Sequence, residues 1–275
     1  MAGRTFRQLI RRRGLKIGTY VGEFATPGIG QIVKSAGCEF VFLDMEHSGF
    51  TYETVKTTLR HIHDAGLASV VRPPSQAYHH VARACDAGAQ GVVPPMLGTA
   101  EDARRLVSYM KYVPQGGRGV ALAIAHDDYT PGPVFDTLAA ANRKTSLVAL
   151  IETAEGVENV DEIAAVDGLD CLWIGHFDLT CSLGIPGEFT SRKFKAACQR
   201  VIDAAKKHRK SMARMVTSPA EGAELFSQGY DVLAYSGDMW LLRAALDTGI
   251  TELRAKIDGR QKRAAATRRK ARAAR

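Results

Sequence analysis

The chain has 275 residues, of which 45% are hydrophobic and 24% are charged, an ordinary composition for a soluble globular protein. This composition excludes a wholly disordered chain, and five cysteines are too few for a small scaffold held by disulfides. No apolar run approaches the roughly 20 residues that span a bilayer, and no signal-peptide core follows the basic start. We therefore expect a cytoplasmic protein with reduced thiols and no membrane partner.

The positive charge is concentrated at one end of the chain. The formal net charge is +8, and residues 260–275 contain eight Lys or Arg and no acid, so residues 1–259 are neutral. This tail has no apolar face, and we expect a frayed helix or a disordered extension. A nucleic-acid-binding protein that uses the tail is the alternative from a different functional class. The neutral body, which shows no nucleic-acid-binding motif, argues against that partner.

After a basic segment at 1–14, short apolar runs alternate with helical patterns. The runs predict strands at Leu15–Val21, Phe40–Leu43, Ser69–Arg72, Gly91–Pro94, Leu147–Glu152, Cys171–Ile174, Ser211–Val216 and Val232–Tyr235. Helices are predicted at Tyr52–Ala65, Tyr78–Ala87, Ala100–Tyr109, Ala154–Ala165, Phe194–His208, Pro219–Gln228 and Met239–Ile257. Continuous apolar runs are typical of parallel strands that are covered on both faces.

Glycines end several of these helices just before the next strand, at Gly37, Gly66, Gly88, Gly168 and Gly229. Eight strands that alternate with helices favour a (β/α)8 TIM barrel over residues 15–259. An open doubly wound sheet is the alternative, but no G-x-G-x-x-G loop follows the first strand. The stretch 114–144 is long for one connection, and we expect a functional insertion after a barrel strand.

Charged side chains recur where the predicted strands end, and in a barrel those ends carry the active site. Glu152 ends the fifth strand and Asp178 follows the sixth, so their carboxylates are expected to meet at one point of the rim. Two carboxylates with open positions suit Mg²⁺ or Mn²⁺, and His47 or His176 would shift the preference towards Co²⁺ or Zn²⁺. The alternative is that each acid caps a helix or forms a salt bridge.

Asp44, His47 and Arg72 are the candidate catalytic groups on the second and third strands. A carboxylate that accepts a hydrogen bond from the imidazole would fix its tautomer and raise its basicity, which suits Asp44 and His47 for acid–base work. Arg72 would stabilise negative charge on an enolate oxygen. The alternatives are an ordinary loop histidine and a salt bridge from Arg72 to Asp44 or Glu46.

The chain resembles the HpcH/HpaI aldolases, class II metal-dependent pyruvate aldolases of the phosphoenolpyruvate/pyruvate barrel superfamily. The resemblance covers roughly residues 15–255 and is carried by phrases in a specific order: FVFLDMEHS, VVRPP, GVVPPM, AEDARRLV, GGRGV, LIETAEGVEN, LWIGHFDLTCSLG and YSGDMWLLR.

The resemblance implies a role for each site residue. Glu152 and Asp178 would bind the metal, His47 with Asp44 would be the acid–base pair, and Arg72 would hold the keto oxygen. Backbone amides of Gly175, His176, Phe177 and Asp178 would receive the substrate carboxylate, and we add Val216 as a further substrate contact. The family typically forms a hexamer, a trimer of dimers, in which the last helix swaps between subunits.

The predicted function is therefore a divalent-metal-dependent aldolase that cleaves or forms 4-hydroxy-2-keto acids from pyruvate or hydroxypyruvate enolate and an aldehyde. A related barrel lyase acting on oxaloacetate or an acyl-CoA ester is the alternative on the same scaffold. Three features depart from the usual family pattern: Leu150, the pair His176–Phe177, and the stretch 123–129. They lie where the substrate is expected, so the aldehyde and the keto acid stay open.

Overall fold

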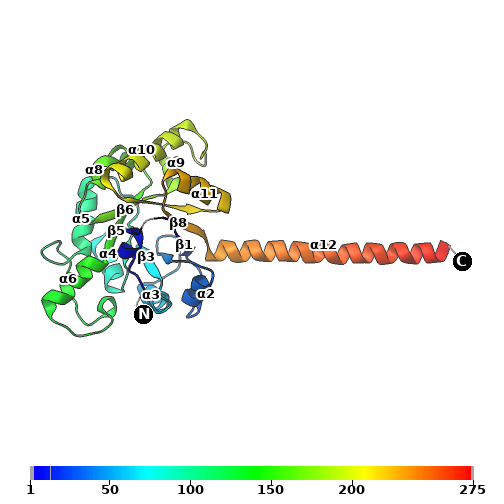
Figure 1. Cartoon of the computed structure of the whole chain (residues 1–275), viewed down its shortest axis with the longest axis horizontal. Coiled ribbons are helices and arrows are strands. Elements are labelled where there is room, and N and C mark those ends of the chain that lie inside the picture. The colour runs from blue at the N-terminus through cyan, green and yellow to red at the C-terminus, as the bar shows by residue number, and fades with distance from the viewer. Residues whose placement is uncertain (1–2, 13, 274–275) are drawn as a thin grey trace. The chain divides into compact units, whose positions relative to one another are not determined.

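The computed structural model describes residues 3–12 and 14–273, and for 262–265 and 267–273 it describes the backbone alone. Within these residues, eight parallel strands close into a barrel in chain order, as the sequence predicted. The strands are β1 (Lys16–Val21), β2 (Phe40–Asp44), β3 (Ala68–Arg72), β4 (Gly91–Val92), β5 (Ser146–Ile151), β6 (Leu169–Ile174), β7 (Ser211–Val216) and β8 (Val232–Gly237). The fold is a (β/α)8 TIM barrel (Figure 1).

Helices follow the strands and cover the barrel. They are α2 (Ile29–Ser35), α3 (Tyr52–Asp64), α4 (Tyr78–Asp86), α5 (Ala100–Met110), α6 (Val134–Lys144), α7 (Ala154–Glu158), α8 (Val160–Ala164), α9 (His176–Ser182), α10 (Arg192–His208) and α11 (Pro219–Gln228). Local sequence sets their ends. The Ser218 hydroxyl caps α11, and Gly229 ends it with a φ of 112°, where a side chain would be strained.

Strand parity divides the side chains into an outer core and a barrel interior. On β2, Val41 and Leu43 join the apolar cluster beneath the helices, whereas Phe42 lies inside the barrel against Trp173 of β6, with ring centroids 4.9 Å apart. Asp44 has the same parity as Phe42 and therefore also points inward. The parallel register then pairs Asp44 with Arg72 at the carboxyl ends of β2 and β3.

The long stretch 114–144 does not follow a barrel strand, which corrects the expectation from the sequence. It lies between α5 and β5 and contains the short 3₁₀ helix η1 (Ala125–Asp127) and α6. A connection from a helix back to a strand belongs to the amino end of the barrel, opposite the ends that carry active sites. The predicted helix at 154–165 is divided into α7 and α8 at Asn159.

The basic N-terminal segment is part of the barrel body. Its helix α1 (Phe6–Ile10) buries Phe6 completely, and the Phe6 ring lies 5.9 Å from that of Phe40 at the start of β2. The Phe6 amide donates to Gln90 Oε1 at 3.0 Å. The predicted boundary between an N-terminal segment and the barrel at residue 14 therefore does not correspond to a structural division.

Residues from Asp238 onward form a second compact unit, the single helix α12 (Asp238–Ala273). The helix runs without a break through residue 260, the predicted start of the basic tail. Among the described residues, no helix is both long enough and apolar enough to cross a membrane.

Candidate active site

Four charged side chains meet at the carboxyl end of the barrel. Asp44 and Arg72 are the last residues of β2 and β3, Glu152 directly follows β5, and Asp178 lies in the first turn of α9 after β6. The charge of Asp178 acts on both Glu152 and Glu46, and that of Arg72 does the same. The structure thus brings together the two predicted metal ligands and the predicted arginine.

Asp44 and Arg72 form a buried bidentate ion pair. Arg72 Nε donates to Asp44 Oδ1 and Arg72 Nη2 to Asp44 Oδ2, both at 2.7 Å. Tyr20 Oη donates to Asp44 Oδ2 at 2.8 Å. Burial by itself would raise the pKa of the Asp44 carboxyl, but the hydrogen bonds and charge of Arg72, together with the Tyr20 hydroxyl, lower it. Asp44 is therefore held ionised, and it fixes the plane of the guanidinium.

The expected pairing of Asp44 with the His47 imidazole is wrong. Asp44 Oδ2 accepts the backbone amide of His47 at 3.3 Å, and the His47 side chain is 62% exposed. The acid near the ring is Glu46, whose Oε2 lies 3.8 Å from His47 Nε2. The reason is local: the turn after β2 folds back so that its amides cap the inward-pointing Asp44, and this directs the His47 ring outward.

Glu46 is a site residue that the sequence indicated only as a salt-bridge partner of Arg72. Its Oε2 lies 3.0 Å from Arg72 Nη1, so the alternative of a salt bridge from Arg72 is confirmed for both Asp44 and Glu46. Burial raises the pKa of Glu46, while the charge of Arg72 opposes the rise. The available signal was its position in the phrase DMEHS, between two candidate catalytic residues.

Glu152 is buried at the centre of this end of the barrel, with 2% of its surface exposed. Its Oε1 accepts the Met96 amide at 2.6 Å. Burial raises the pKa of Glu152 to about 7; the Met96 amide counteracts this and the charge of Asp178 adds to it. Gly175 makes room for this carboxylate, because a Cβ at that position would lie 2.5 Å from Glu152 Oε2. A buried acid beside other acids is a charge that a cation would stabilise.

The donor set at Glu152 and Asp178 fits a hard divalent cation. Both groups are carboxylates, Asp178 is exposed, and the charge of Asp178 acts on Glu152 across the turn after β6. The described residues contain no group of three or more His, Cys, Asp or Glu side chains able to hold a metal ion. Two carboxylates that leave the other positions to water or substrate are a common way of binding Mg²⁺.

The segment 175–178 is only partly available to a substrate carboxylate. The Gly175 amide donates to Ile151 O at 3.2 Å within the sheet, so the expected contact from this amide is wrong. The amides of His176, Phe177 and Asp178 start α9, where helical amides have no partner inside the helix. The His176 ring packs against Phe177 and Phe189. Burial, with help from Arg214, lowers the pKa of His176 to about 4, which does not favour a charged imidazole there.

Val216, a predicted substrate contact, and Leu150, a departure from the family pattern, are both apolar and buried. Val216 is 3% exposed, belongs to the outer core, and faces α11, where its Cγ2 lies 3.7 Å from the position of a Cβ on Gly222. A substrate contact from the Val216 side chain is therefore excluded by strand parity. Leu150 lies inside the barrel in register with Trp173, on the same strand face as Glu152. Tyr20, Phe42 and Trp173 complete an aromatic floor beneath the charged groups.

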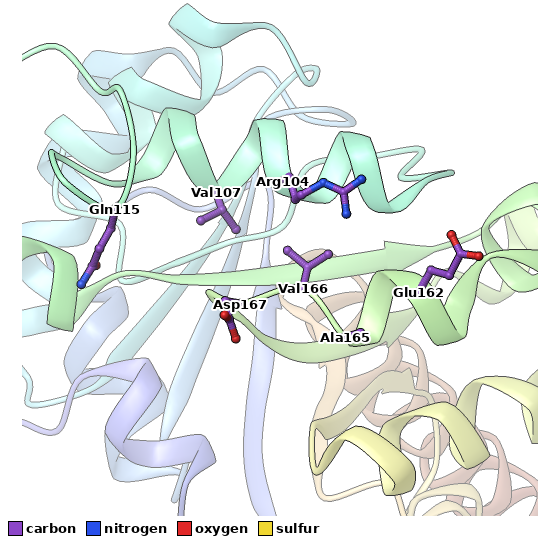
Figure 2. A pocket seen from close by; sticks show the side chains of 7 residues that line it. All are labelled: Arg104, Val107, Gln115, Glu162, Ala165, Val166 and Asp167. Atoms are coloured by element: carbon purple, nitrogen blue, oxygen red, sulfur yellow. The ribbon is translucent and has the colours of Figure 1, made fainter.

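A surface hollow of about 430 Å³ lies elsewhere, between α5, α8 and the turn that precedes β6 (Figure 2). It is lined by Arg104, Val107, Gln115, Glu162, Ala165, Val166 and Asp167. The lining contains none of the charged residues at the carboxyl end of the barrel. This hollow is therefore separate from the candidate active site.

Comparisons with known proteins agree with this arrangement. The HpcH/HpaI aldolase/citrate lyase family model matches residues 16–244. The crystal structure of an HpcH/HpaI aldolase from Desulfitobacterium hafniense is similar with a TM-score of 0.85 and 28% identity, over 90% of this chain and 96% of that one. The 5-keto-4-deoxy-D-glucarate aldolase of Klebsiella pneumoniae is 29% identical over 87% of this chain and 93% of its own length. The hydroxypyruvate/pyruvate aldolase of Chromohalobacter salexigens is 32% identical over 85% and 91%.

Proposed function

Since the chain belongs to the HpcH/HpaI aldolase/citrate lyase family and is an aldolase, we propose that it joins or cleaves pyruvate or hydroxypyruvate and an aldehyde with the help of a divalent metal. The product of the joining direction is a 4-hydroxy-2-keto acid. The observation that carries the proposal is the meeting of Glu152 and Asp178 with a guanidinium that Asp44 holds in place.

Glu152 and Asp178 are the residues that would hold the metal, with Mg²⁺ or Mn²⁺ favoured by their oxygen donors and Co²⁺ or Zn²⁺ as the other candidates. When bound, such an ion supplies Lewis acidity that stabilises negative charge on the keto acid. The chain itself prepares the place for it: the Met96 amide orients Glu152, and Gly175 leaves the space that its carboxylate needs.

Arg72 binds the keto oxygen in this proposal and stabilises the enolate. A guanidinium carries five N–H donors, and the contacts with Asp44 and Glu46 involve Nε, Nη1 and Nη2 once each. Donors therefore remain for a substrate oxygen. Because Asp44 is buried and bidentate, the guanidinium does not have to reorganise when negative charge develops, which is the condition for effective electrostatic catalysis.

His47 moves the proton of the substrate hydroxyl. Its ring is exposed, Asp44 does not engage it, and Glu46 lies beside it. The ring is thus accessible to a substrate and to water at the same time, as a general acid–base requires. The amides of His176, Phe177 and Asp178 receive the substrate carboxylate at the start of α9.

We also propose that the protein is a homo-oligomer, with the hexamer and the swapped last helix of the family as the expected form. Support comes from α12, on which Leu246, Ile250, Leu253 and Ile257 are exposed at spacings of four, three and four residues. This spacing places them along one side of the helix, which is typical of a helix that packs against another chain.

The test is a pyruvate-release assay with a panel of 4-hydroxy-2-keto acids. We expect release with Mg²⁺ or Mn²⁺, loss of at least about 100-fold after full chelation with EDTA, and recovery when the metal is restored. Activity that survives complete chelation would remove the metal from the proposal. Absence of pyruvate release with every keto acid and metal of the panel would count against the aldol reaction.

A further inference from the structure

We propose that Phe177 forms an apolar subsite for the acceptor, which selects aldehydes with an apolar or aromatic side chain over aldehydes that carry a second carboxylate. This inference rests on the proposed aldol reaction and deepens it, because it names the acceptor class. Phe177 is 62% exposed although it lies in the turn that carries the predicted metal ligand Asp178.

The Phe177 ring is held in place by neighbouring aromatic rings. Phe194 of α10 is buried and lies 5.8 Å from Phe189, which lies 5.1 Å from Phe177 with the ring planes at 87°. The His176 ring adds a further contact at 4.6 Å. The edge-on contacts among the three phenylalanines connect the Phe177 ring to the hydrophobic core. Phe177 therefore offers a rigid apolar surface, which loses little conformational entropy when a ligand packs on it.

The position of this surface links it to the reaction. Phe177 directly precedes Asp178, and Gly175, two residues earlier, is packed against the Glu152 carboxylate. A keto acid held at Glu152, Arg72 and the amides of α9 would extend its reacting carbon past this turn. An acceptor that approaches from the solvent side of the turn meets the exposed face of Phe177.

Met96 extends the apolar surface on the side of Glu152. The residue is 56% exposed, and its backbone has a φ of 58°, a strained value for a residue with a Cβ. Its amide holds Glu152, while Gln76 Nε2 donates to the carbonyls of Pro95 and Met96 at 2.8 and 2.9 Å. The backbone at Met96 is therefore held on both sides, and this exposed residue directly contacts the predicted metal ligand Glu152 through its amide.

Charge at this end of the barrel opposes a second carboxylate. The strongest electrostatic neighbours of Glu152 are Asp178, Arg72 and Glu46, two acids and one base. Arg72 is already engaged by Asp44 and Glu46, and the proposed function assigns its remaining donors to the keto oxygen. With the proposed cation compensating Glu152 and Asp178, the two acids Asp44 and Glu46 still outnumber the one base Arg72. A distal carboxylate on the acceptor would therefore meet a net negative charge, whereas an apolar group would cover Phe177 and Met96 and remove their surface from water.

The experiment compares two acceptors in the same enzyme preparation, with pyruvate as donor and Mg²⁺ present. Benzaldehyde represents the apolar class and succinic semialdehyde the carboxylate class. We expect the ratio of kcat/KM, benzaldehyde over succinic semialdehyde, to exceed about ten in the unmodified protein. The F177S variant should lower this ratio about tenfold, and F177L, which keeps an apolar side chain, should change it by less than about threefold.

The matched control is F135A, since Phe135 on α6 is also an exposed phenylalanine, with 79% of its surface exposed. This variant should leave the ratio unchanged. A ratio near or below one in the unmodified protein would overturn the inference without any variant. The same holds if F177S keeps the original ratio or alters only the oligomeric state in light scattering, which would place Phe177 in a subunit contact.

Deuterium exchange at the pyruvate methyl group separates this inference from the proposed function. Exchange requires only enolate formation and no aldehyde. If exchange is absent, the proposed function fails. If exchange occurs but the anionic aldehyde is preferred, only the acceptor subsite is refuted.

Discussion

The two ends of the barrel treat charge in opposite ways. At the amino end, two cations pair with one carboxylate each: Lys16 with Asp231, and Arg7 with Asp170 at 3.0 Å. At the carboxyl end, the charges of Asp44, Glu46 and Glu152 act on one guanidinium, that of Arg72, and Asp178 adds a further acid beside Glu152. Balanced buried pairs serve the fold, whereas an excess of one sign at a strand end is a site prepared for a ligand of the other sign.

We expect the largest effect, a loss of activity, from substitutions at the carboxyl end of the barrel. E152Q and D178N should each lower kcat/KM for keto acid cleavage by about 10³-fold, because each removes a charge that the metal needs. Stability should not fall for E152Q, since the variant replaces a buried acid next to other acids with a neutral group of similar shape. Activity and urea unfolding, measured on the same preparations, check both statements. If E152Q lowered the unfolding free energy enough to account for its loss of activity, Glu152 would serve to stabilise the fold and not to bind the metal.

At the amino end, the effect should fall on stability. Lys16 is fully buried, donates to Arg12 O at 3.1 Å and pairs with Asp231, so K16M breaks a buried ion pair and should cost about 3 kcal/mol of unfolding free energy. kcat of the folded variant should stay close to that of the unmodified enzyme. K34M, at an exposed lysine of α2, is the control and should shift stability by less than about 0.5 kcal/mol.

The third prediction concerns His47, whose imidazole does not pair with Asp44. Because its exposed ring is assigned to proton transfer and not to a structural pair with Asp44, H47Q should lower kcat about 100-fold with no measurable change in unfolding free energy. H79Q, at an exposed histidine of α4, should change neither quantity. A clear loss of stability in H47Q would show that the imidazole supports the turn after β2.

The smallest predicted effect is a pH dependence at the amino half of β3. His63 Nε2 lies 2.9 Å from Ser69 Oγ, and burial, assisted by Lys144, lowers the pKa of His63 to about 4. In the unfolded chain, His63 has the ordinary His pKa of about 6.5. Between pH 6.5 and pH 4 the unfolded chain therefore binds a proton at His63 that the folded chain does not bind. Stability should therefore fall as pH decreases from 6.5 towards 4, by up to about 2 kcal/mol at pH 5 relative to H63Q. Urea titrations of both proteins at pH 7 and pH 5 measure the difference, and parallel losses would contradict it.

The sequence predicts the positions of the elements because their causes are local. Continuous apolar runs placed all eight strands near their observed bounds, and a glycine with positive φ, such as Gly229, marked a helix end. It also brought Arg72, Glu152 and Asp178 to one end of the barrel, since the carboxyl ends of parallel strands meet there. These inferences need only the period of a strand and the order of the chain.

The partners of those side chains were decided by tertiary structure. Asp44 turns to Arg72 because barrel closure sets the register of β2 against β3, which three-residue spacing to His47 cannot reveal. The Gly175 amide donates to Ile151 O for the same reason. Val216 faces α11 because strand pairing in the closed barrel decides which face of β7 points outward. The chain by itself determined which residues reach the carboxyl end; distances across the closed barrel determined which of them touch, because those contacts join segments far apart in sequence.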